Sequence, residues 1–153
     1  MVKQPLHKIW NKRFRPKSKR RVVLLEDLWM DRWKQNILDI KKKQALDLGC
    51  GCGLDSLYLY KQGFEVTAVD FSKEALEICK ENAPDAELIM HDISKPLPFN
   101  REQFGIISAS LSLHYFDKST THQVLADIHR CLDKNGILMV RLNSTKDIHF
   151  GAF

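Results

Sequence analysis

The feature that most constrains this chain is residues 45–57, Ala-Leu-Asp-Leu-Gly-Cys-Gly-Cys-Gly-Leu-Asp-Ser-Leu, where an apolar strand runs into a glycine-rich turn and a helix. Glycines allow the backbone to turn sharply and to approach a ligand closely, and a helix N-terminus offers N–H groups to an anion. The next strand ends in Asp70, 17 residues after Gly53. A carboxylate at that place can bind both hydroxyls of a ribose. The pattern predicts a nucleoside-binding βαβ unit.

The spacing of the glycines limits which nucleoside fits. A phosphate-binding Walker A loop requires Gly-Lys-Ser/Thr, whereas Gly53 is followed by Leu54 and Asp55. The dinucleotide pattern Gly-x-Gly-x-x-Gly fails in both frames, because Leu54 and Ser56 stand where the last glycine is needed. A nucleotide triphosphatase and a nicotinamide or flavin enzyme are therefore disfavoured.

The remaining pattern, Asp47-x-Gly49-x-Gly51-x-Gly53 followed by Asp70, resembles motif I and the next acidic motif of class I S-adenosylmethionine-dependent methyltransferases. The resemblance continues at residues 91–93, 108–116 and 132–138, and it covers about residues 44–142. The chain is most similar to small bacterial methyltransferases, including those related to tellurite-resistance and small-molecule enzymes. This resemblance implies S-adenosyl-L-methionine as the cofactor and a small molecule as the methyl acceptor.

Strands alternate with helices along the chain, which predicts an α/β fold with a Rossmann-like, doubly wound and mainly parallel sheet in three αβα layers. Five strands are expected where the family has seven. The expected strands are 44–48, 64–69, 86–90, 103–109 and 137–142, and the expected helices are 23–40, 54–62, 72–83 and 118–132. A turn at Asn135-Gly136 is expected to introduce the last strand.

The resemblance implies a set of cofactor-binding residues: Asp47, Gly49, Cys50, Gly51, Gly53, Asp70, Phe71, Ser72, Asp92, Ile93 and Ser110. The glycines would contact the methionine part of the cofactor, and Asp47 would hold the turn and the cofactor amino group. Asp70 would accept hydrogen bonds from the ribose hydroxyls. Phe71 and Ile93 would border the adenine, and Asp92 would bind its amino group. A turn without a ligand, and a purely local role for Asp92, are the structural alternatives.

The carboxyl end of the fourth expected strand is where open α/β sheets bind their ligands. His114 lies there and is the candidate catalytic base, since imidazole titrates near neutral pH; lining the substrate site is its alternative role. Trp29 and Trp33 are expected either to cover the cofactor or to pack on the sheet. No metal site is expected, because Cys50-x-Cys52 alone is a poor zinc ligand set.

Charge divides the chain into two parts. Residues 1–21 carry nine Lys/Arg and no acidic residue, whereas the remainder has 15 basic and 19 acidic residues. We expect a basic arm at 1–21 and a cofactor-binding domain at 22–153. The arm offers a second hypothesis, RNA as the methyl acceptor, although solvated charge is its default interpretation. The cysteines and the lack of long apolar runs favour a cytoplasmic protein with reduced thiols and without a membrane span.

The last expected strand would be an exposed apolar edge, because only residues 143–153 follow it. Three explanations stay open: a fragment of a longer chain that lacks strands 6 and 7, a homodimer completed through this edge, or a reduced binding module. The cofactor half of the family pattern is present, so cofactor binding is expected more firmly than turnover.

Overall fold

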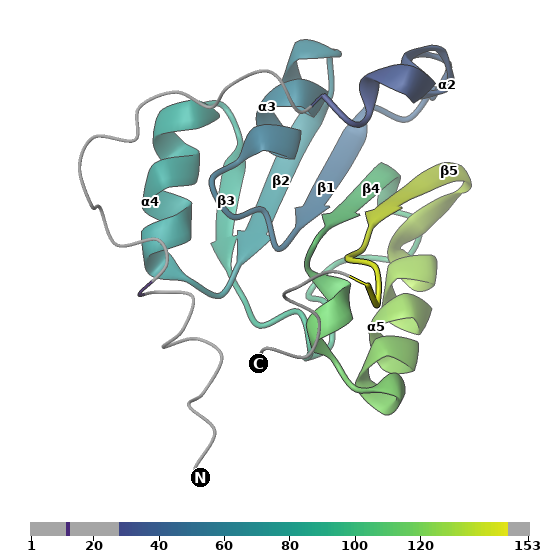
Figure 1. Ribbon diagram of the computed structural model, residues 1–153. Helices are drawn as coiled ribbons and strands as arrows, with labels where there is room; N and C mark the ends of the chain where they lie inside the picture. The colour runs from purple at the N-terminus through teal and green to yellow at the C-terminus, as the bar shows by residue number, and fades with distance from the viewer. Residues whose placement is uncertain (1–11, 13–27, 147–153) are drawn as a thin grey trace, which may run out of the picture.

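The computed structural model describes residues 12 and 28–146. Five parallel strands form one sheet in the order β3-β2-β1-β4-β5, with helices on both faces (Figure 1). The expected α/β doubly wound fold is confirmed. The basic arm at 1–21, apart from Lys12, and the first part of the helix expected at 23–40 lie outside the described residues.

The helices and strands agree with most of the expected ranges. In chain order they are η1 (Asp31–Trp33), α2 (Lys34–Leu38), β1 (Gln44–Leu48), α3 (Leu54–Lys61), β2 (Glu65–Asp70), α4 (Lys73–Asn82), β3 (Glu87–Met90), β4 (Phe104–Ser110), η2 (Leu113–Tyr115), α5 (Lys118–Cys131) and β5 (Leu132–Arg141). Within the described part of the chain, no helix is both long enough and apolar enough to cross a membrane.

The sheet separates two apolar cores because successive strand residues point to opposite faces. On β1, Ala45 joins the core under α2, α3 and α4, whereas Leu46 and Leu48 join the core under α5. Leu59 of α3 and Ile128 of α5 are buried on these two faces. The sheet therefore forms the middle of three layers, as expected.

The continuous helix expected at 23–40 is wrong over residues 28–33. This part forms a turn and the short 3-10 helix η1, and α-helix is limited to α2. Contacts with α3 explain the difference. Trp29 Nε1 donates to Asp55 Oδ1 at 3.0 Å, and the hydroxyl of Tyr58 donates to Asp31 Oδ1 at 3.3 Å. Met30, which stands between Trp29 and Asp31 in the chain, is buried. These tertiary contacts override the helical pattern of the sequence.

The carboxyl-terminal strand begins earlier than expected. Helix α5 continues directly into β5, and the pairing with β4 shifts between Phe104–Leu132 and Ile106–Ile137. The expected turn at Asn135-Gly136 is therefore an irregular part of a single strand. β5 lies at the edge of the five-stranded sheet, next to β4. The homodimer through this edge stays a prediction.

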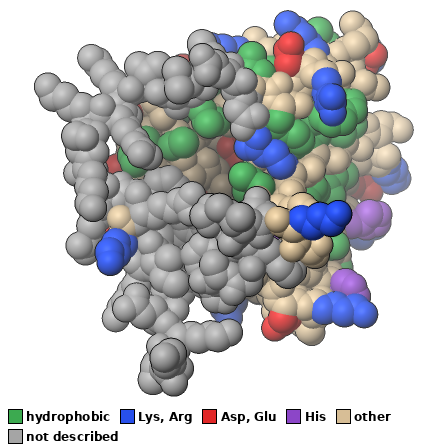
Figure 2. Space-filling view, in the orientation of Figure 1, with side chains coloured by type: hydrophobic (Ala, Val, Ile, Leu, Met, Phe, Trp, Pro, Cys, Tyr) green, Lys and Arg blue, Asp and Glu red, His purple; other side chains and the backbone are tan. Residues whose placement is uncertain are grey.

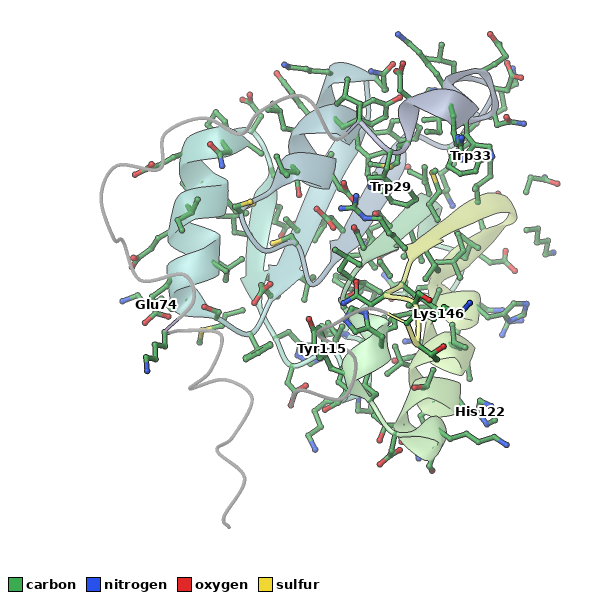
Figure 3. All side chains as sticks on the ribbon, in the orientation of Figure 1. Trp29, Trp33, Glu74, Tyr115, His122 and Lys146 are labelled. Carbon is green, nitrogen blue, oxygen red and sulfur yellow. The ribbon has the colours of Figure 1, made fainter. Side chains whose placement is uncertain are left out.

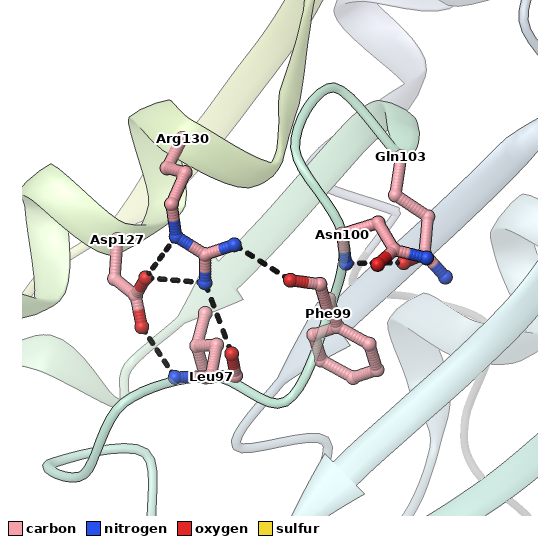
Figure 4. Close-up of polar contacts among 6 residues, drawn as sticks. All are labelled: Leu97, Phe99, Asn100, Gln103, Asp127 and Arg130. Atoms are coloured by element: carbon pink, nitrogen blue, oxygen red, sulfur yellow. Dashed lines mark hydrogen bonds and ion pairs between the residues drawn. The ribbon is translucent and has the colours of Figure 1, made fainter.

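The loop between β3 and β4 is fastened to α5 by one arginine (Figure 4). Arg130 donates to the carbonyl oxygens of Phe99 at 2.6 Å and Leu97 at 3.0 Å, and its Nε donates to Asp127 at 2.7 Å. Asp127 also accepts a hydrogen bond from the Leu97 N–H. These contacts fix a loop that has no strand or helix of its own and lead the chain from β3 back to β4.

Candidate functional site

The glycine turn between β1 and α3 has the backbone that its sequence predicts. Gly49, Gly51 and Gly53 have φ angles of 70°, 52° and 80°, which residues with side chains rarely adopt. Packing adds a second requirement at two of them. A Cβ on Gly49 would lie 2.6 Å from Cβ of Ser112, and one on Gly53 would lie 2.5 Å from Sγ of Cys79. Glycine is thus needed at both positions for conformation and for space.

The N–H groups of this turn bind acceptors within the protein. Those of Gly49 and Cys50 donate to the carbonyl oxygen of Val69 at 2.8 and 2.9 Å. Those of Gly51 and Gly53 donate to Asp70 Oδ2 at 3.0 Å and to the Cys50 carbonyl at 2.8 Å. The turn is therefore tied to the end of β2, and anion binding by the N-terminus of α3 stays a prediction.

Asp70 ends β2 and connects the turn to α4. Its Oδ2 accepts from Gly51 N–H and its Oδ1 accepts from Ser72 N–H at 2.9 Å. Burial raises the pKa of this carboxyl, although these N–H groups act in the opposite direction. A carboxylate can accept about four hydrogen bonds. The N–H groups of Gly51, Ser72 and Phe71 act on this one, so it keeps capacity for a further donor such as a ribose hydroxyl. Ser72 is the expected N-cap of α4, since its Oγ accepts from Ala75 N–H at 3.2 Å.

The residues expected around an adenine lie after β2 and β3. Phe71 is half-buried, and Ile93 is buried in the core under α5. Asp92 is exposed, and its Oδ1 accepts from both the N–H and the hydroxyl of Ser94 at 2.9 and 2.7 Å. The local turn role that was the alternative for Asp92 is thus present. Binding of adenine by these residues stays a prediction.

Cys50 presents its side chain to the protein interior. A hydrogen bond with Cys79, followed by burial, holds the pKa of the Cys50 thiol far above its usual value. The same hydrogen bond is the main cause that lowers the pKa of Cys79. Any ligand contact of residue 50 therefore has to come from its backbone.

Two carboxylates are buried beneath the turn. Asp47, 1% exposed, accepts from Ser56 Oγ at 2.6 Å. Asp55 accepts from Ser108 Oγ at 2.7 Å and from Trp29 Nε1 at 3.0 Å. Burial, and then the charge of Asp55, raise the pKa of Asp47 well above its usual value. Paired acids in such a place favour a cation beside them. The sequence reasoning missed Asp55, whose only signal was an acid in the first turn of the helix.

A second polar group lies where β4 and β5 end. Ser110 Oγ accepts from Arg141 Nε at 2.9 Å, and Leu111, with φ of 55°, donates its N–H to the Arg141 carbonyl at 2.7 Å. Ser112 Oγ donates to the Leu48 carbonyl at 2.9 Å, beside the glycine turn. Arg141 and Ser112 were missed, although Arg141 is a charge at the end of an apolar run.

Tyr115, the chain neighbour of the candidate base His114, and the two tryptophans lie at different parts of the fold (Figure 3). His114 is half-buried in η2 after β4, with its ring centroid 4.1 Å from that of Tyr115. Trp29 packs against the core under α3 and meets Trp33 edge-on, with the centroids 6.3 Å apart. Packing, one of the two expected fates of the tryptophans, is therefore found for Trp29. The catalytic role of His114 stays a prediction.

A comparison with protein families identifies the family to which this glycine turn and its neighbouring residues belong. Residues 45–136, which include the glycine turn and Asp70, match the model of the family described as a methyltransferase domain. The chain belongs to this family. The expected membership among the methyltransferases of this fold is confirmed.

Methyltransferases of known sequence and structure resemble the chain over most of its length. It is 30% identical over 103 residues to an uncharacterized methyltransferase of Synechocystis, covering 67% of this chain and 48% of that protein. It is 29% identical over 118 residues to the demethylmenaquinone methyltransferase of Thermotoga maritima, covering 76% and 50%. The crystal structure of a TehB-like SAM-dependent methyltransferase from Corynebacterium glutamicum superposes with a TM-score of 0.63 at 25% identity, covering 74% and 62%. The chain thus spans about half the length of these curated relatives.

Proposed function

We propose that this chain binds S-adenosyl-L-methionine at the carboxyl ends of β1 and β2 and transfers its methyl group to a small molecule. The single observation that carries the proposal is the Asp70 carboxylate. It is fixed by the N–H groups of Gly51 and Ser72 and keeps capacity for a further hydrogen-bond donor. Such a group fits a ribose with two neighbouring hydroxyls.

The other residues of the site fit the charge of this cofactor. S-adenosylmethionine supplies a methyl group on a positively charged sulfonium, which a nucleophile can displace. Asp47 and Asp55 are buried acids beneath the turn, so they favour a bound cation such as the amino group of the methionine part. The ends of β4 and β5 would hold the nucleophile in line, since positioning supplies much of the rate in such a transfer. His114 would accept a proton where the nucleophile carries one.

A small molecule is favoured as the methyl acceptor. The Thermotoga relative is named for a small-molecule substrate, and the TehB-like neighbour agrees with the resemblance noted from the sequence. Figure 2 shows basic and acidic side chains intermixed on the described part of the face in view. A nucleic-acid surface is expected to gather basic side chains. RNA as the methyl acceptor would depend on the basic arm at 1–21. A cytoplasmic location of the protein agrees with its cysteine content.

Calorimetry tests the proposal directly. S-adenosylhomocysteine, the product form of the cofactor, should bind to the chain with one-to-one stoichiometry, and NAD should not bind. Binding of NAD without binding of S-adenosylhomocysteine would refute the proposal in favour of an oxidoreductase. A turnover assay with radiolabelled methyl donor then separates an active transferase from a domain that binds the cofactor without transfer.

A salt titration separates the two classes of methyl acceptor. If RNA is the acceptor, affinity for it should fall steeply between low and physiological salt and should be lost when residues 1–21 are deleted. If the acceptor is a small molecule, the deletion should leave both the affinity for S-adenosylhomocysteine and the methyl transfer unchanged. Retention of RNA methylation by the shortened chain would contradict the role of the arm.

A further inference from the structure

The glycine turn is held by helix α4 in addition to its contacts with β2. Asn82, the last residue of α4, donates from Nδ2 to the carbonyl oxygen of Cys52 at 2.8 Å. One turn earlier in the helix, Cys79 packs against Gly53, where a Cβ would lie 2.5 Å from the Cys79 Sγ. Residues three apart in a helix are neighbours on one face. The glycine turn is therefore contacted by two adjacent side chains of α4.

The hydrogen bond from Asn82 fixes a peptide group that glycine leaves free to rotate. Cys52 stands between Gly51 and Gly53, whose φ angles are 52° and 80°. Glycine adopts positive and negative φ with similar ease, so the peptide group between Cys52 and Gly53 can rotate at little steric cost. The N–H of this peptide group donates to the Cys50 carbonyl at 2.8 Å, and its carbonyl accepts from Asn82. Hydrogen bonds on opposite sides of the peptide group thus select one orientation.

The end of α4 gives Asn82 a rigid base. The next residue, Ala83, is 1% exposed and belongs to the apolar core under α2, α3 and α4. Its N–H donates to the Cys79 carbonyl at 2.7 Å, and the following Pro84 disfavours a further helical residue. Asn82 itself is half-buried. The amide of Asn82 therefore acts from a backbone whose position is fixed by the core.

We propose that Asn82 is a positioning residue for the cofactor, because it sets the shape of the glycine turn that would bind the methionine part of S-adenosyl-L-methionine. This inference rests on the proposed function, since it concerns how the same site holds its cofactor. At the other end of the helix, the N–H of Ser72 donates to Asp70 on the ribose side. α4 thus holds both parts of the cofactor site at a fixed separation. A site with its shape set before binding loses less conformational entropy when the ligand enters.

Calorimetry with S-adenosylhomocysteine tests the role of Asn82. Asn82→Ala removes the donor to the Cys52 carbonyl and should weaken binding about threefold to tenfold, the change that corresponds to one neutral hydrogen bond. Lys80→Ala is the matched control, because Lys80 Nζ donates to the Pro84 carbonyl near the same end of α4, also at 2.8 Å. It should leave the affinity unchanged. Equal affinities of Asn82→Ala and the wild-type chain, or equal losses in the two variants, would refute the proposal.

Asn82→Asp separates the hydrogen bond from the packing of the side chain. The two side chains have nearly the same shape, but the carboxylate present at about pH 8 has no hydrogen to donate to the Cys52 carbonyl. If Asn82 positions the turn through its N–H, Asn82→Asp should bind S-adenosylhomocysteine no better than Asn82→Ala. If Asp restored the affinity of the wild-type chain, shape alone would explain the role of the residue and the proposal would be wrong.

Nuclear magnetic resonance of the Gly53 amide adds a measurement on the wild-type chain that does not depend on the folding of any variant. A single sharp signal is expected with and without S-adenosylhomocysteine, because the peptide group has one orientation before the ligand binds. In Asn82→Ala, the same signal should be broadened by exchange in the free chain and should sharpen when the ligand binds. Exchange broadening in the free wild-type chain would overturn the proposal.

The two proposals fail in different ways. If S-adenosylhomocysteine binds to none of the chains, the proposed function is wrong, and the positioning role of Asn82 is wrong with it. If the wild-type chain and Asn82→Ala bind it equally well, the proposed function stands and only the role of Asn82 is refuted.

Discussion

The two sides of the candidate site are built in different ways. On the β1–β2 side, the N–H groups of Gly51 and Ser72 donate to the carboxylate of Asp70, and the three residues lie within 22 residues of chain. On the β4–β5 side, Trp29, Asp55 and Arg141 meet through side chains from distant parts of the sequence. The first side is a local backbone structure that tolerates few residue types. The second depends on tertiary packing between distant parts of the chain.

The largest effect should come from substitution of the turn itself. Gly53→Ala combines a left-handed φ of 80° with a Cβ placed 2.5 Å from Cys79 Sγ. Strain and overpacking should together lower the free energy of unfolding by about 2–4 kcal/mol. Urea denaturation followed by circular dichroism measures this loss.

Gly63→Ala is the matched control for this substitution. Gly63 has a similar φ of 86°, but a Cβ there meets no atom within 4 Å. Only conformational strain remains, so the cost should be about 1–2 kcal/mol. Equal losses in the two variants would show that the contact between Gly53 and Cys79 adds nothing to the rigidity of the β1–β2 side.

Asp70→Asn should weaken binding of S-adenosylhomocysteine by about 1.5–3 kcal/mol, the cost of replacing a charged hydrogen-bond partner. Calorimetry measures the change. Glu77→Gln, an exposed carboxylate on α4, is the control and should leave the affinity unchanged. If Asp70→Asn binds as tightly as the wild-type chain, the ribose site is not at the end of β2.

Local patterns explain why one side of the site could be predicted and the other could not. The glycine turn, Asp70 and the Ser72 cap depend on backbone angles and on residues close in sequence, which a single sequence displays. The docking of residues 28–33 on α3 depends on Trp29 meeting Asp55, 26 residues apart. Helical spacing predicted a helix there, and a tertiary contact prevailed. Arg141 was hidden for the same reason, since its partner Ser110 is 31 residues away.

A pH dependence should distinguish the buried acid of the β1–β2 side from surface carboxyls. The pKa of Asp47 is raised in the folded chain, so its protonation favours folding. This contribution is complete below the ordinary pKa of 3.8 and is lost as the pH rises through the raised pKa of the folded state. Asp47→Asn cannot ionise. Relative to the wild-type chain it should gain unfolding free energy as the pH rises from 4 to 8.

Denaturation by urea at a series of pH values checks this expectation, with the exposed Asp39→Asn as the comparison. Asp47→Asn should also lose affinity for S-adenosylhomocysteine, because the amide does not attract the amino group of the ligand. A gain in stability together with a loss of binding would show that the Asp47 carboxylate serves ligand binding at the cost of stability. Parallel pH profiles in all three chains would contradict the raised pKa.

The smallest effect concerns the β4–β5 side, where the two tryptophans provide a matched pair. Trp29→Phe removes the hydrogen bond to Asp55 and weakens the cation–π contact with Arg141. It should therefore lower the free energy of unfolding by about 1 kcal/mol. Trp33 is 43% exposed and contacts Trp29 edge-on, so Trp33→Phe should cost only a few tenths. Urea denaturation of both variants measures the difference. Equal costs would mean that Trp29 contributes burial alone, and the orientation of Arg141 would then depend on Ser110. A larger cost for Trp29→Phe would show that the polar contacts of Trp29 add stability beyond the burial of its ring.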